Sequence, residues 1–311
     1  MQNDSPSVLV VGAGAVGAFY GSALARQGAR VTVVCRSDFA AVSSEGYHIR
    51  SPLLGDHQFR PAGVLRDAGD CQAAPDYLVL AVKVLDGTDR VALLRPAVGP
   101  KTVVVLIENG VDIEMPIAAA FPDNELLSCL AFIAVTRRGN GEIHHQSAGW
   151  LTMGCYPAGI TPAARKLAEL LEASGVNCRL TQDVIGARWQ KAVWNASFNP
   201  ISIMGGVLDT AMMLATPDAQ AFVRQTMQEI CAVAGAEGHP QSPKLIEQLI
   251  QGTLAMPAYK TSMAIDYENG RSMEIEAILG NVVRAGRKHG VAMPALESLY
   301  ALAGMIQRAK A

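Results

Sequence analysis

The sequence predicts an α/β domain built on a largely parallel sheet, followed by a domain made only of helices. Short, wholly apolar runs, typical of strands buried on both faces of a sheet, alternate with helical segments in the first half of the chain. From about Asp183 to the end, helical periodicity dominates and no convincing strand follows. We therefore expect an α/β domain over residues 1–182 and a helical domain over residues 183–311.

The expected elements of the first domain follow one another in βαβ order. The expected strands are residues 8–11, 31–34, 77–82, 102–107 and 126–135, and the expected helices are residues 15–27, 86–95 and 162–174. Residues 143–155 alternate Thr, Trp and Gly, which favours smaller antiparallel strands appended to the sheet. Residues 176–180 form the last expected strand, and Thr181-Gln182-Asp183 marks the crossing between the domains.

A glycine-rich turn, Gly12-Ala-Gly14-Ala-Val-Gly17, follows the first apolar run. In this G-x-G-x-x-G pattern Gly12 permits the tight turn, Gly14 lets the backbone approach a pyrophosphate, and Gly17 lets the helix lie close to the strand. The phosphates would face the amides of the first helical turn, which adds Ala15 and Val16 to the expected contacts. The motif predicts a Rossmann fold that binds a dinucleotide.

The residue that ends the second expected strand distinguishes two cofactors. An Asp or Glu there would hydrogen-bond the adenosine ribose hydroxyls and favour NAD, whereas Arg36 offers a planar, permanently charged fork to a 2′-phosphate. Ser37 would add a hydroxyl donor to the same phosphate. A solvated arginine after a strand would be the ordinary explanation, but beside the glycine motif Arg36 favours NADPH as the cofactor.

Two polar residues, Lys83 and Asn109, lie just past the carboxyl ends of expected parallel strands. Open α/β sheets bind their ligands at these ends. Loop polarity alone would explain either residue, and Asn-Gly is also a common turn dipeptide. Taken singly, each residue is therefore only a candidate for the cofactor site.

Lys191, Asn195 and Asn199 are spaced four residues apart at the start of the helical domain. Successive i,i+4 positions drift by only about 40° around a helix, so the three side chains share one face. A solvated polar stripe would give the same spacing. However, asparagine is a mediocre helix former, and it recognises carboxylates and hydroxyls well. The stripe is therefore also a plausible pocket for a small oxo acid.

A second polar stretch runs from Ser262 to Glu276 and holds several carboxylates. An exposed, charge-laced loop would explain it. Glu274 stands at the head of an expected helix, where the helix dipole favours a carboxylate anyway. The stretch alone does not indicate which acid takes part in chemistry.

The composition excludes several classes of protein. The chain has 311 residues, of which 50% are hydrophobic and 17% are charged, and it can therefore bury two cores. A net charge of −2 provides no positive field for nucleic acid or an anionic membrane. The six cysteines are scattered without a C-x-x-C pair, which indicates reduced thiols of a cytoplasmic protein and no metal site.

The longest uncharged stretch, residues 8–25, is not expected to span a membrane, because its glycines break it into strand, turn and helix. Residues 1–7 lack the positive segment of a secretory signal. We expect a soluble, unexported protein. Its apolar C-terminal helices would support a homodimer.

Together these residues resemble the ketopantoate reductase family over nearly the whole chain. The residues that carry the resemblance are Gly12, Gly14, Gly17, Arg36, Val82-Lys83, Asn109-Gly110, Lys191, Asn195, Asn199-Pro200, Ser262 and Glu274. The Lys/Asn/Asn-Pro helix and the Ser-to-Glu spacing are far more specific than the glycine motif. The resemblance implies NADPH-dependent reduction of 2-dehydropantoate (ketopantoate) to (R)-pantoate, a step towards pantothenate and coenzyme A.

The resemblance also implies roles for single residues. Lys191 would be the general acid on the ketone oxygen, assisted by Glu274. The residues implied to hold the substrate are Asn195, Asn199, Ser262 and Asn109, and those implied near the nicotinamide half of the cofactor are Lys83 and Asn109. The chemistry agrees, because hydride arriving at a ketone carbon leaves a developing alkoxide that needs a proton and a nearby positive charge.

Two residues depart from the family pattern. Glu108 stands where many relatives have glutamine and would place a carboxylate near the cofactor. Asp209 stands where an asparagine often helps to bind the substrate, and it would repel an anionic keto acid unless it is paired or protonated. Two alternatives therefore stay open: a reductase of another 2-oxo acid, and an NADPH-binding sensor, which would have no need for Lys191.

Overall fold

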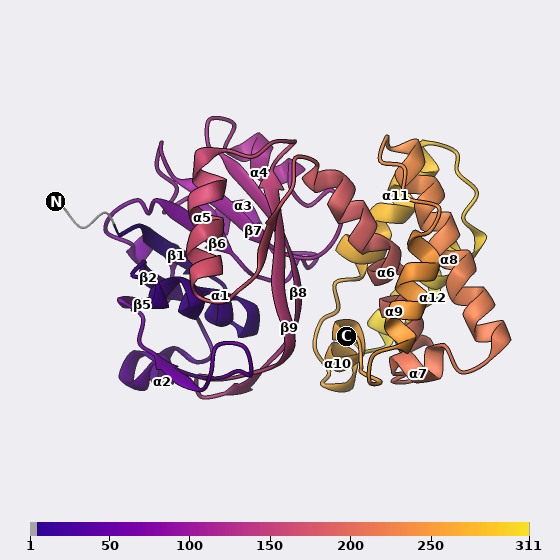
Figure 1. Cartoon of the computed structure of the whole chain (residues 1–311), viewed down its shortest axis with the longest axis horizontal. Helices are drawn as coiled ribbons and strands as arrows, with labels where there is room; N and C mark the ends of the chain where they lie inside the picture. The colour runs from indigo at the N-terminus through magenta and orange to yellow at the C-terminus, as the bar shows by residue number, and fades with distance from the viewer. Residues whose placement is uncertain (1–4, 311) are drawn as a thin grey trace. The chain divides into compact units, whose positions relative to one another are not determined.

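The computed structural model of the protein describes residues 5–310. Residues 1–4, which belong to the segment expected to lack a secretory signal, lie outside this description. The chain divides into two compact units (Figure 1). The first contains the chain up to Lys83, Asp89–Glu108 and Glu114–Val184, and the second contains Val84–Thr88, Asn109–Ile113 and the chain from Ile185 onward.

The first unit is built on one sheet. Its strands are β1 (Ser7–Val11), β2 (Arg30–Val34), β3 (Tyr47–Arg50), β4 (His57–Phe59), β5 (Gly63–Leu65), β6 (Tyr77–Leu80), β7 (Val103–Ile107), β8 (Leu126–Gly139), β9 (Glu142–Cys155) and β10 (Cys178–Leu180). The order is β4-β3-β9-β8-β7-β6-β1-β2-β5, and β10 pairs with β9. The run from β5 to β8 is parallel and has the 3-2-1-4-5-6 order of a Rossmann sheet, so the predicted fold is confirmed.

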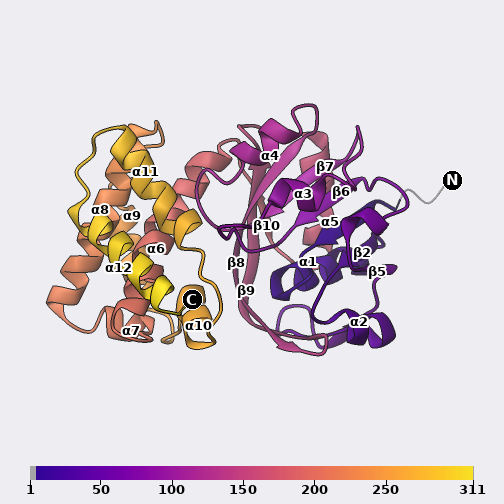
Figure 2. The ribbon, with the colours of Figure 1, turned by 180° about the vertical axis from the view of Figure 1, so that it is seen from behind.

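Helices cover the sheet of the first unit. They are α1 (Ala15–Arg26), α2 (Phe39–Glu45), α3 (Arg90–Leu94), α4 (Met115–Ala120) and α5 (Pro162–Ala173). α1 packs against α5 and against strands β1, β2, β8 and β9. α5 covers the face seen in Figure 1, and α3 and α4 pack together on the face seen in Figure 2.

The central strands are buried because they carry almost no polar side chains. Val10, Leu78, Leu80 and Leu106 have no exposed surface. Burying a side chain of this size is worth about 1.5–3 kcal/mol, so each of these strands stabilises the sheet substantially. The apolar runs in the sequence predicted these strands to within two residues of their observed ends.

Two expectations in the first unit are wrong in detail, and several short elements were not expected. The helix expected over residues 86–95 is only α3, because Asp89 caps its start by accepting a hydrogen bond from the amide of Ala92. Residues 143–155 lie in one long strand, β9, rather than in several small ones. Its pairing with β8 continues through an irregularity at Gly149, which is absorbed as a bulge. Finally, α2 and β3–β5 were not expected, since strands of three or four residues carry little periodic signal.

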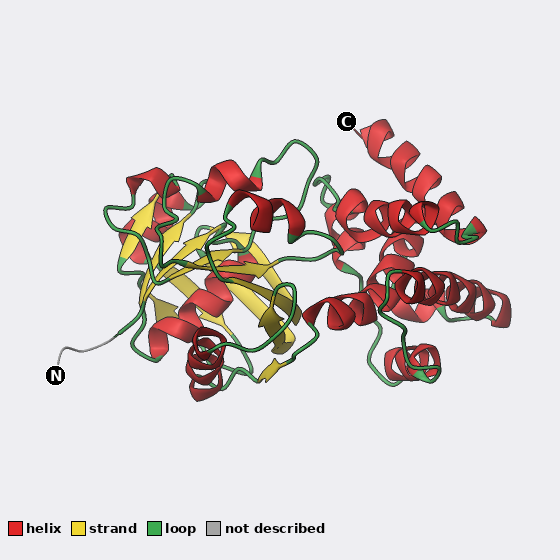
Figure 3. Ribbon diagram, turned by 90° about the horizontal axis from the view of Figure 1, so that it is seen from above, coloured by secondary structure: helices red, strands yellow, loops and turns green. Residues whose placement is uncertain are grey.

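Helices joined by loops make up the second unit within its described residues, apart from one isolated bridge between Asp209 and Lys260 (Figure 3). Its helices are α6 (Val184–Met204), α7 (Thr210–Met213), α8 (Pro217–Ala236), α9 (Leu245–Leu254), α10 (Ser262–Glu268), a π-helical turn (Glu276–Gly280), α11 (Asn281–Lys288) and α12 (Pro294–Lys310). α8 packs against α9, α11 and α12 around a core that includes Met227, Ile230 and Leu296. The expectation of an all-helical second domain is confirmed.

No helix within residues 5–310 combines the length and the apolar character that a membrane crossing requires.

Candidate active site

The glycine turn of the first unit has the shape that a pyrophosphate site needs. Gly12 has a φ of +87°, and a Cβ there would lie 2.5 Å from Cγ1 of Val82. A Cβ on Gly17 would lie 2.6 Å from the carbonyl oxygen of Gly12, so α1 approaches the end of β1 closely. A Cβ on Gly14 would meet no atom within 4 Å. Gly14 therefore leaves open space where the backbone would face a phosphate.

The turn is fixed from two sides. The amides of Gly12 and Ala13 both donate to the carbonyl of Val34, at 3.3 and 3.1 Å. From β3, the hydroxyl of Tyr47 donates to the carbonyl of Ala13 at 2.7 Å, and burial raises the pKa of Tyr47, which keeps this donor protonated. No side chain caps the start of α1, so the amides of its first turn, at Ala15 onward, can meet an anion.

The other cofactor candidates of the first unit lie at the same edge of the sheet. Arg36 and Ser37 lie two and three residues after the end of β2 and are exposed, and Lys83 lies three residues after the end of β6 and is half-buried. β2, β1 and β6 are parallel neighbours, so their carboxyl ends meet at one edge. The structure thus brings the predicted residues of the first unit to the edge where Rossmann folds bind dinucleotides.

In the second unit, Lys191 contacts the segment that contains Asn109. The distance from Nζ of Lys191 to Oδ1 of Asn109 is 2.8 Å. Asn109 begins the Asn109–Ile113 segment, which follows β7 along the chain but packs within the helical unit. The two residues lie 82 positions apart in the sequence, so this contact connects candidates that were predicted separately.

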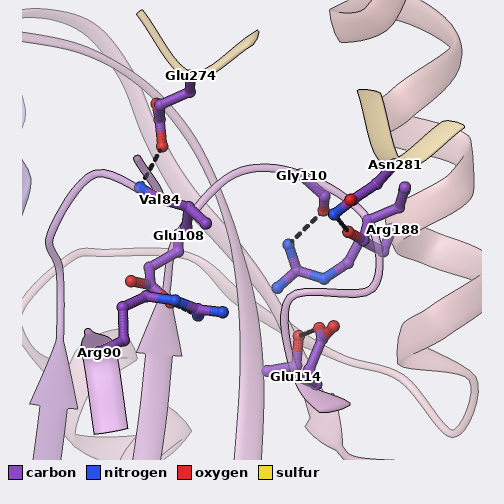
Figure 4. Close-up of polar contacts among 10 residues, drawn as sticks. Val84, Arg90, Glu108, Gly110, Glu114, Arg188, Glu274 and Asn281 are labelled. Carbon is purple, nitrogen blue, oxygen red and sulfur yellow. Dashed lines mark hydrogen bonds and ion pairs between the residues drawn. The ribbon is translucent and has the colours of Figure 1, made fainter. Parts of the chain in front are cut away.

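Three further contacts hold the backbone of this segment. Arg188 donates from Nη1 to the carbonyl of Gly110 at 2.9 Å, and Asn281 donates from Nδ2 to the carbonyl of Val111 at 2.6 Å (Figure 4). The amide of Val111 donates to the carbonyl of Ala277, in the π-helical turn, at 3.2 Å. The position of Asn109 is therefore set by α6, by the π-helical turn and by the start of α11.

Gly110 is required by this packing. Its φ is +108°, a conformation that side chains other than glycine rarely adopt. A Cβ at this position would also lie 2.5 Å from the carbonyl oxygen of Ala277. The Asn109-Gly110 dipeptide is thus more than a turn signal, because the glycine permits the contact that fixes the asparagine.

The electrostatic environment of Lys191 brings its titration close to neutral pH. Burial, followed by the nearby charge of Arg188, lowers the pKa of Lys191 to about 7, and the carboxylate of Glu274 partly opposes this. Both the protonated and the neutral amine are then populated near pH 7. A group with such a pKa can give and accept a proton under the same conditions.

A small hollow adjoins Lys191 within the second unit. Its lining residues are Gly110, Arg188, Lys191, Ala192, Asn195 and Ile278. Lys191 and Asn195 line it together because they lie one turn apart on α6. Ala192 and Ile278 add apolar surface, so the hollow combines cationic, amide and apolar walls.

Asn199 does not line this hollow, but it hydrogen-bonds both Asn195, which does, and Ser262. Its Nδ2 donates to the carbonyl of Asn195 at 3.0 Å. Its Oδ1 accepts hydrogen bonds from the hydroxyl of Ser262 at 3.3 Å and from the amide of Met263 at 3.2 Å. Asn199 is 1% exposed, whereas Ser262 is exposed. The structure therefore brings together Asn199 and Ser262, with the serine hydroxyl nearer to solvent.

Glu274 is the acid of the second polar stretch that reaches the environment of Lys191. It is buried, and its Oε1 accepts a hydrogen bond from the amide of Val84 at 3.0 Å (Figure 4). Its charge acts on Lys191, as the pKa of the lysine shows. The other acids of this stretch pair elsewhere: Asp266 with Arg271, Glu268 with Lys260, and Glu276 with Arg284.

Both carboxylates that depart from the family pattern have structural partners. Glu108 forms a buried ion pair with Arg90, with 2.9 Å between Oε2 and Nη1 (Figure 4). Asp209 caps α7, because its Oδ1 accepts a hydrogen bond from the amide of Met212 at 2.8 Å. The charge of Glu108 is balanced by Arg90, and one oxygen of Asp209 is engaged by the helix.

Sequence reasoning missed three residues that position candidates in one unit or the other. Arg188 lies three positions before Lys191 on α6, and its helical spacing could have identified it. Asn281 and Tyr47 act through contacts with residues 170 and 34 positions away, which no local pattern reveals. Within residues 5–310, no group of three or more His, Cys, Asp or Glu side chains is placed to hold a metal ion.

Comparison with protein families gives two matches that together cover most of the chain. The family model described as "Ketopantoate reductase PanE/ApbA" matches residues 8–158. The model described as "Ketopantoate reductase PanE/ApbA C terminal" matches residues 183–307.

Individual relatives carry similar descriptions. The chain is 30% identical to a 2-dehydropantoate 2-reductase of Nostoc sp., over 94% of this chain and 92% of that protein. The crystal structure of 2-dehydropantoate 2-reductase from Methylococcus capsulatus is 51% identical, has a TM-score of 0.93, and is covered over 98% of both chains. The corresponding structure from Geobacter metallireducens is 31% identical with a TM-score of 0.90, over 96% of this chain and 99% of that one.

Proposed function

The chain belongs to the ketopantoate reductase family, which is a family of oxidoreductases, and from this membership we propose that it reduces 2-dehydropantoate to (R)-pantoate with NADPH. The observation that carries the proposal is the placement of Lys191. Its amine contacts Asn109, lines a hollow with Asn195, and has a pKa of about 7. These are the properties that a general acid for a ketone requires.

The residues of the first unit fit the proposed cofactor. The open space at Gly14 and the uncapped start of α1 would receive the pyrophosphate, with Ala15 and Val16 supplying amides. Arg36 would bind the 2′-phosphate, and Lys83 would lie towards the nicotinamide half. Bound NADPH would supply the hydride.

Lys191 has two tasks in the proposed reaction. Its ammonium stabilises the negative charge that develops on the ketone oxygen, and it transfers a proton to that oxygen. Its contact with Oδ1 of Asn109 restricts the direction of the amine, so less reorganisation is needed when substrate binds. Glu274 favours the protonated form of Lys191 through its charge.

We assign the remaining candidates to the substrate. Asn195 faces the hollow and offers an amide to the substrate's hydroxyl or carboxylate. Ser262 offers an exposed hydroxyl to the carboxylate. Asn199 acts beside both, since it hydrogen-bonds the backbone of Asn195 and the side chain of Ser262. Asn109 completes the set through its side chain.

The experiment that tests the proposal is NADPH oxidation with ketopantoate as the sole acceptor. A panel of 2-oxo acids, including pyruvate and branched keto acids, distinguishes the specific reaction from a related reductase. Ketopantoate is expected to give the highest kcat/KM. A higher value for another 2-oxo acid would reassign the substrate, and no turnover with any of them would favour a cofactor-binding sensor.

The setting of the reaction is also a proposal. Pantoate would enter pantothenate and coenzyme A synthesis in the cytoplasm. A homodimer would use apolar side chains that are exposed on the second unit, among them Met212, Phe222, Leu254, Leu302 and Met305. Light scattering of the purified chain tests the homodimer.

A further inference from the structure

An acid lies next to the expected phosphate site at the end of β2. Asp38 comes two residues after Arg36 and is only 7% exposed. A buried carboxylate so near to Arg36 in the sequence would repel the 2′-phosphate of NADPH, which carries a charge of about −1.5 to −2. Binding of NADPH therefore depends on how the charge of Asp38 is balanced.

Arg137 balances it from a different strand. It belongs to the distal part of β8, and its Nη1 lies 2.7 Å from Oδ1 of Asp38. The side chain of Arg137 remains 39% exposed, so the guanidinium is accessible while it neutralises the acid. The two residues are 99 positions apart, and the pair exists only because β8 extends well beyond the end of β7.

The same guanidinium orients Ser37. Nη1 of Arg137 also donates to the hydroxyl oxygen of Ser37 at 2.9 Å. Arginine has no acceptor, so the serine oxygen must be the acceptor in this contact. The hydroxyl hydrogen of Ser37 is then left to donate in another direction, and a phosphate oxygen bound by Arg36 is a suitable acceptor.

A third arginine reinforces the positive charge at this edge. Arg66 follows β5, which pairs with β2 so that Leu65 stands beside Val34. Its guanidinium lies 4.0 Å from the ring centroid of Phe39 and is exposed. With Asp38 neutralised by Arg137, the end of β2 presents Arg36 and Arg66 to solvent without an opposing acid charge from Asp38.

We propose that Arg137 contributes, together with Arg36, to the preference for NADPH over NADH, by neutralising Asp38 and by directing the hydroxyl of Ser37 towards the 2′-phosphate. The inference rests on the proposed function, in which Arg36 binds that phosphate. It assigns part of the cofactor preference to a residue about a hundred positions away from the motif that sequence reasoning uses.

The test measures dissociation constants of NADPH and NADH with the full chain, by titration followed through the fluorescence of bound nicotinamide. Arg137→Ala is expected to weaken NADPH about tenfold, the effect of one charge interaction of moderate strength, and NADH less than about twofold. Asp38→Asn combined with Arg137→Ala should recover most of the loss. Arg138→Ala, which removes the neighbouring exposed arginine of β8, should leave both constants unchanged.

Equal weakening of both cofactors by Arg137→Ala, or no recovery in the double variant, would overturn the inference. Arg137→Gln covers the case in which the alanine variant does not fold, because glutamine keeps a donor for Asp38 but removes the charge. It should also lose the preference for NADPH. If Arg36→Ala abolishes the preference for NADPH but both Arg137 variants keep it, the role of Arg137 is rejected. The proposed NADPH dependence then still stands. An unaltered chain with no preference would reject the proposed NADPH dependence as well.

Discussion

The side-chain amine of Lys191 donates a hydrogen bond to the side-chain oxygen of Asn109, with 2.8 Å between Nζ and Oδ1. Asn109 is held in turn by the backbone contacts of its own segment with Arg188, Asn281 and Ala277. The direction of the proposed proton donor is therefore set by residues that need not touch substrate. Such support is what keeps a catalytic side chain in a productive geometry.

Lys191→Ala is expected to lower kcat for ketopantoate reduction by about 10²–10⁴-fold, the usual contribution of a positioned proton donor. The dissociation constant of NADPH should stay unchanged, because the glycine turn and Arg36 belong to the first unit. Steady-state kinetics and cofactor titration measure the two effects. Replacing the exposed Lys260 with alanine provides a control in the same unit. Normal turnover by Lys191→Ala would remove the lysine from the mechanism.

The reaction should depend on pH through Lys191. The amine must be protonated for reduction and has a pKa of about 7, so kcat should be constant well below pH 7 and fall above it. The fall should approach about tenfold per pH unit, as for loss of one essential proton. Arg188→Gln keeps a donor for the carbonyl of Gly110 but removes a positive charge, and should move the fall to higher pH. An unchanged profile in that variant would contradict the assignment.

Arg36→Ala is expected to weaken NADPH binding by about tenfold or more and to leave NADH binding nearly unchanged. The reason is that only NADPH carries the phosphate that a guanidinium binds through charge-assisted hydrogen bonds. Isothermal titration with both cofactors checks this. Arg30→Ala removes an exposed arginine from the opposite end of the same strand and serves as the control. Equal losses for the two cofactors would reject the role of Arg36.

Gly110→Ala tests the packing that fixes Asn109. The substitution is expected to cost about 1–3 kcal/mol in backbone strain, and more from the clash with the carbonyl of Ala277. Gly270→Ala is the matched control, because Gly270 also has a positive φ but faces open space. The thermal midpoint and kcat should both fall further for Gly110→Ala. Equal effects of the two substitutions would show that the close approach does not matter.

Glu108→Gln introduces the residue that the family resemblance leads us to expect at this position, yet it is expected to destabilise this chain. It leaves the buried guanidinium of Arg90 beside a neutral partner, and breaking a buried pair in this way costs about 3–5 kcal/mol. Calorimetry of thermal unfolding measures the change. Replacing Arg90 and Glu108 together with Met and Leu should recover most of the stability. A fully stable Glu108→Gln variant would show that the pair is dispensable.

The parts of the site that sequence predicted are those with local causes. The glycine turn follows from the positive φ of Gly12, a conformation that other residues rarely adopt. Lys191 shares a helical face with Asn195 because the two lie four residues apart. The contacts of Asn281 with Val111 and of Arg137 with Asp38 depend on how distant segments pack. No periodic pattern records such pairs, so only the folded chain reveals them.

The fold of the first unit shows the same division. Its apolar strands were predicted because burial on both faces requires an unbroken run of apolar side chains, as in β6 and β7. The strand expected over residues 126–135 ends four residues before β8 does, and residues 143–155 were expected as several small strands rather than as the single strand β9. Pairing between β8 and β9 keeps Thr136, Arg137 and their neighbours in a strand, although this part of the sequence has no strong strand preference of its own.

The helical unit is not one continuous piece of the chain, since Val84–Thr88 and Asn109–Ile113 belong to it. A fragment cut at the crossing near residue 183 would retain Lys191 and Glu274 but leave behind the Asn109 side chain and the Val84 amide that they contact. Chimeras that exchange this half between homologous proteins would meet the same difficulty. A chimera that keeps the helical unit intact must therefore also carry Val84–Thr88 and Asn109–Ile113, which lie in the first half of the sequence.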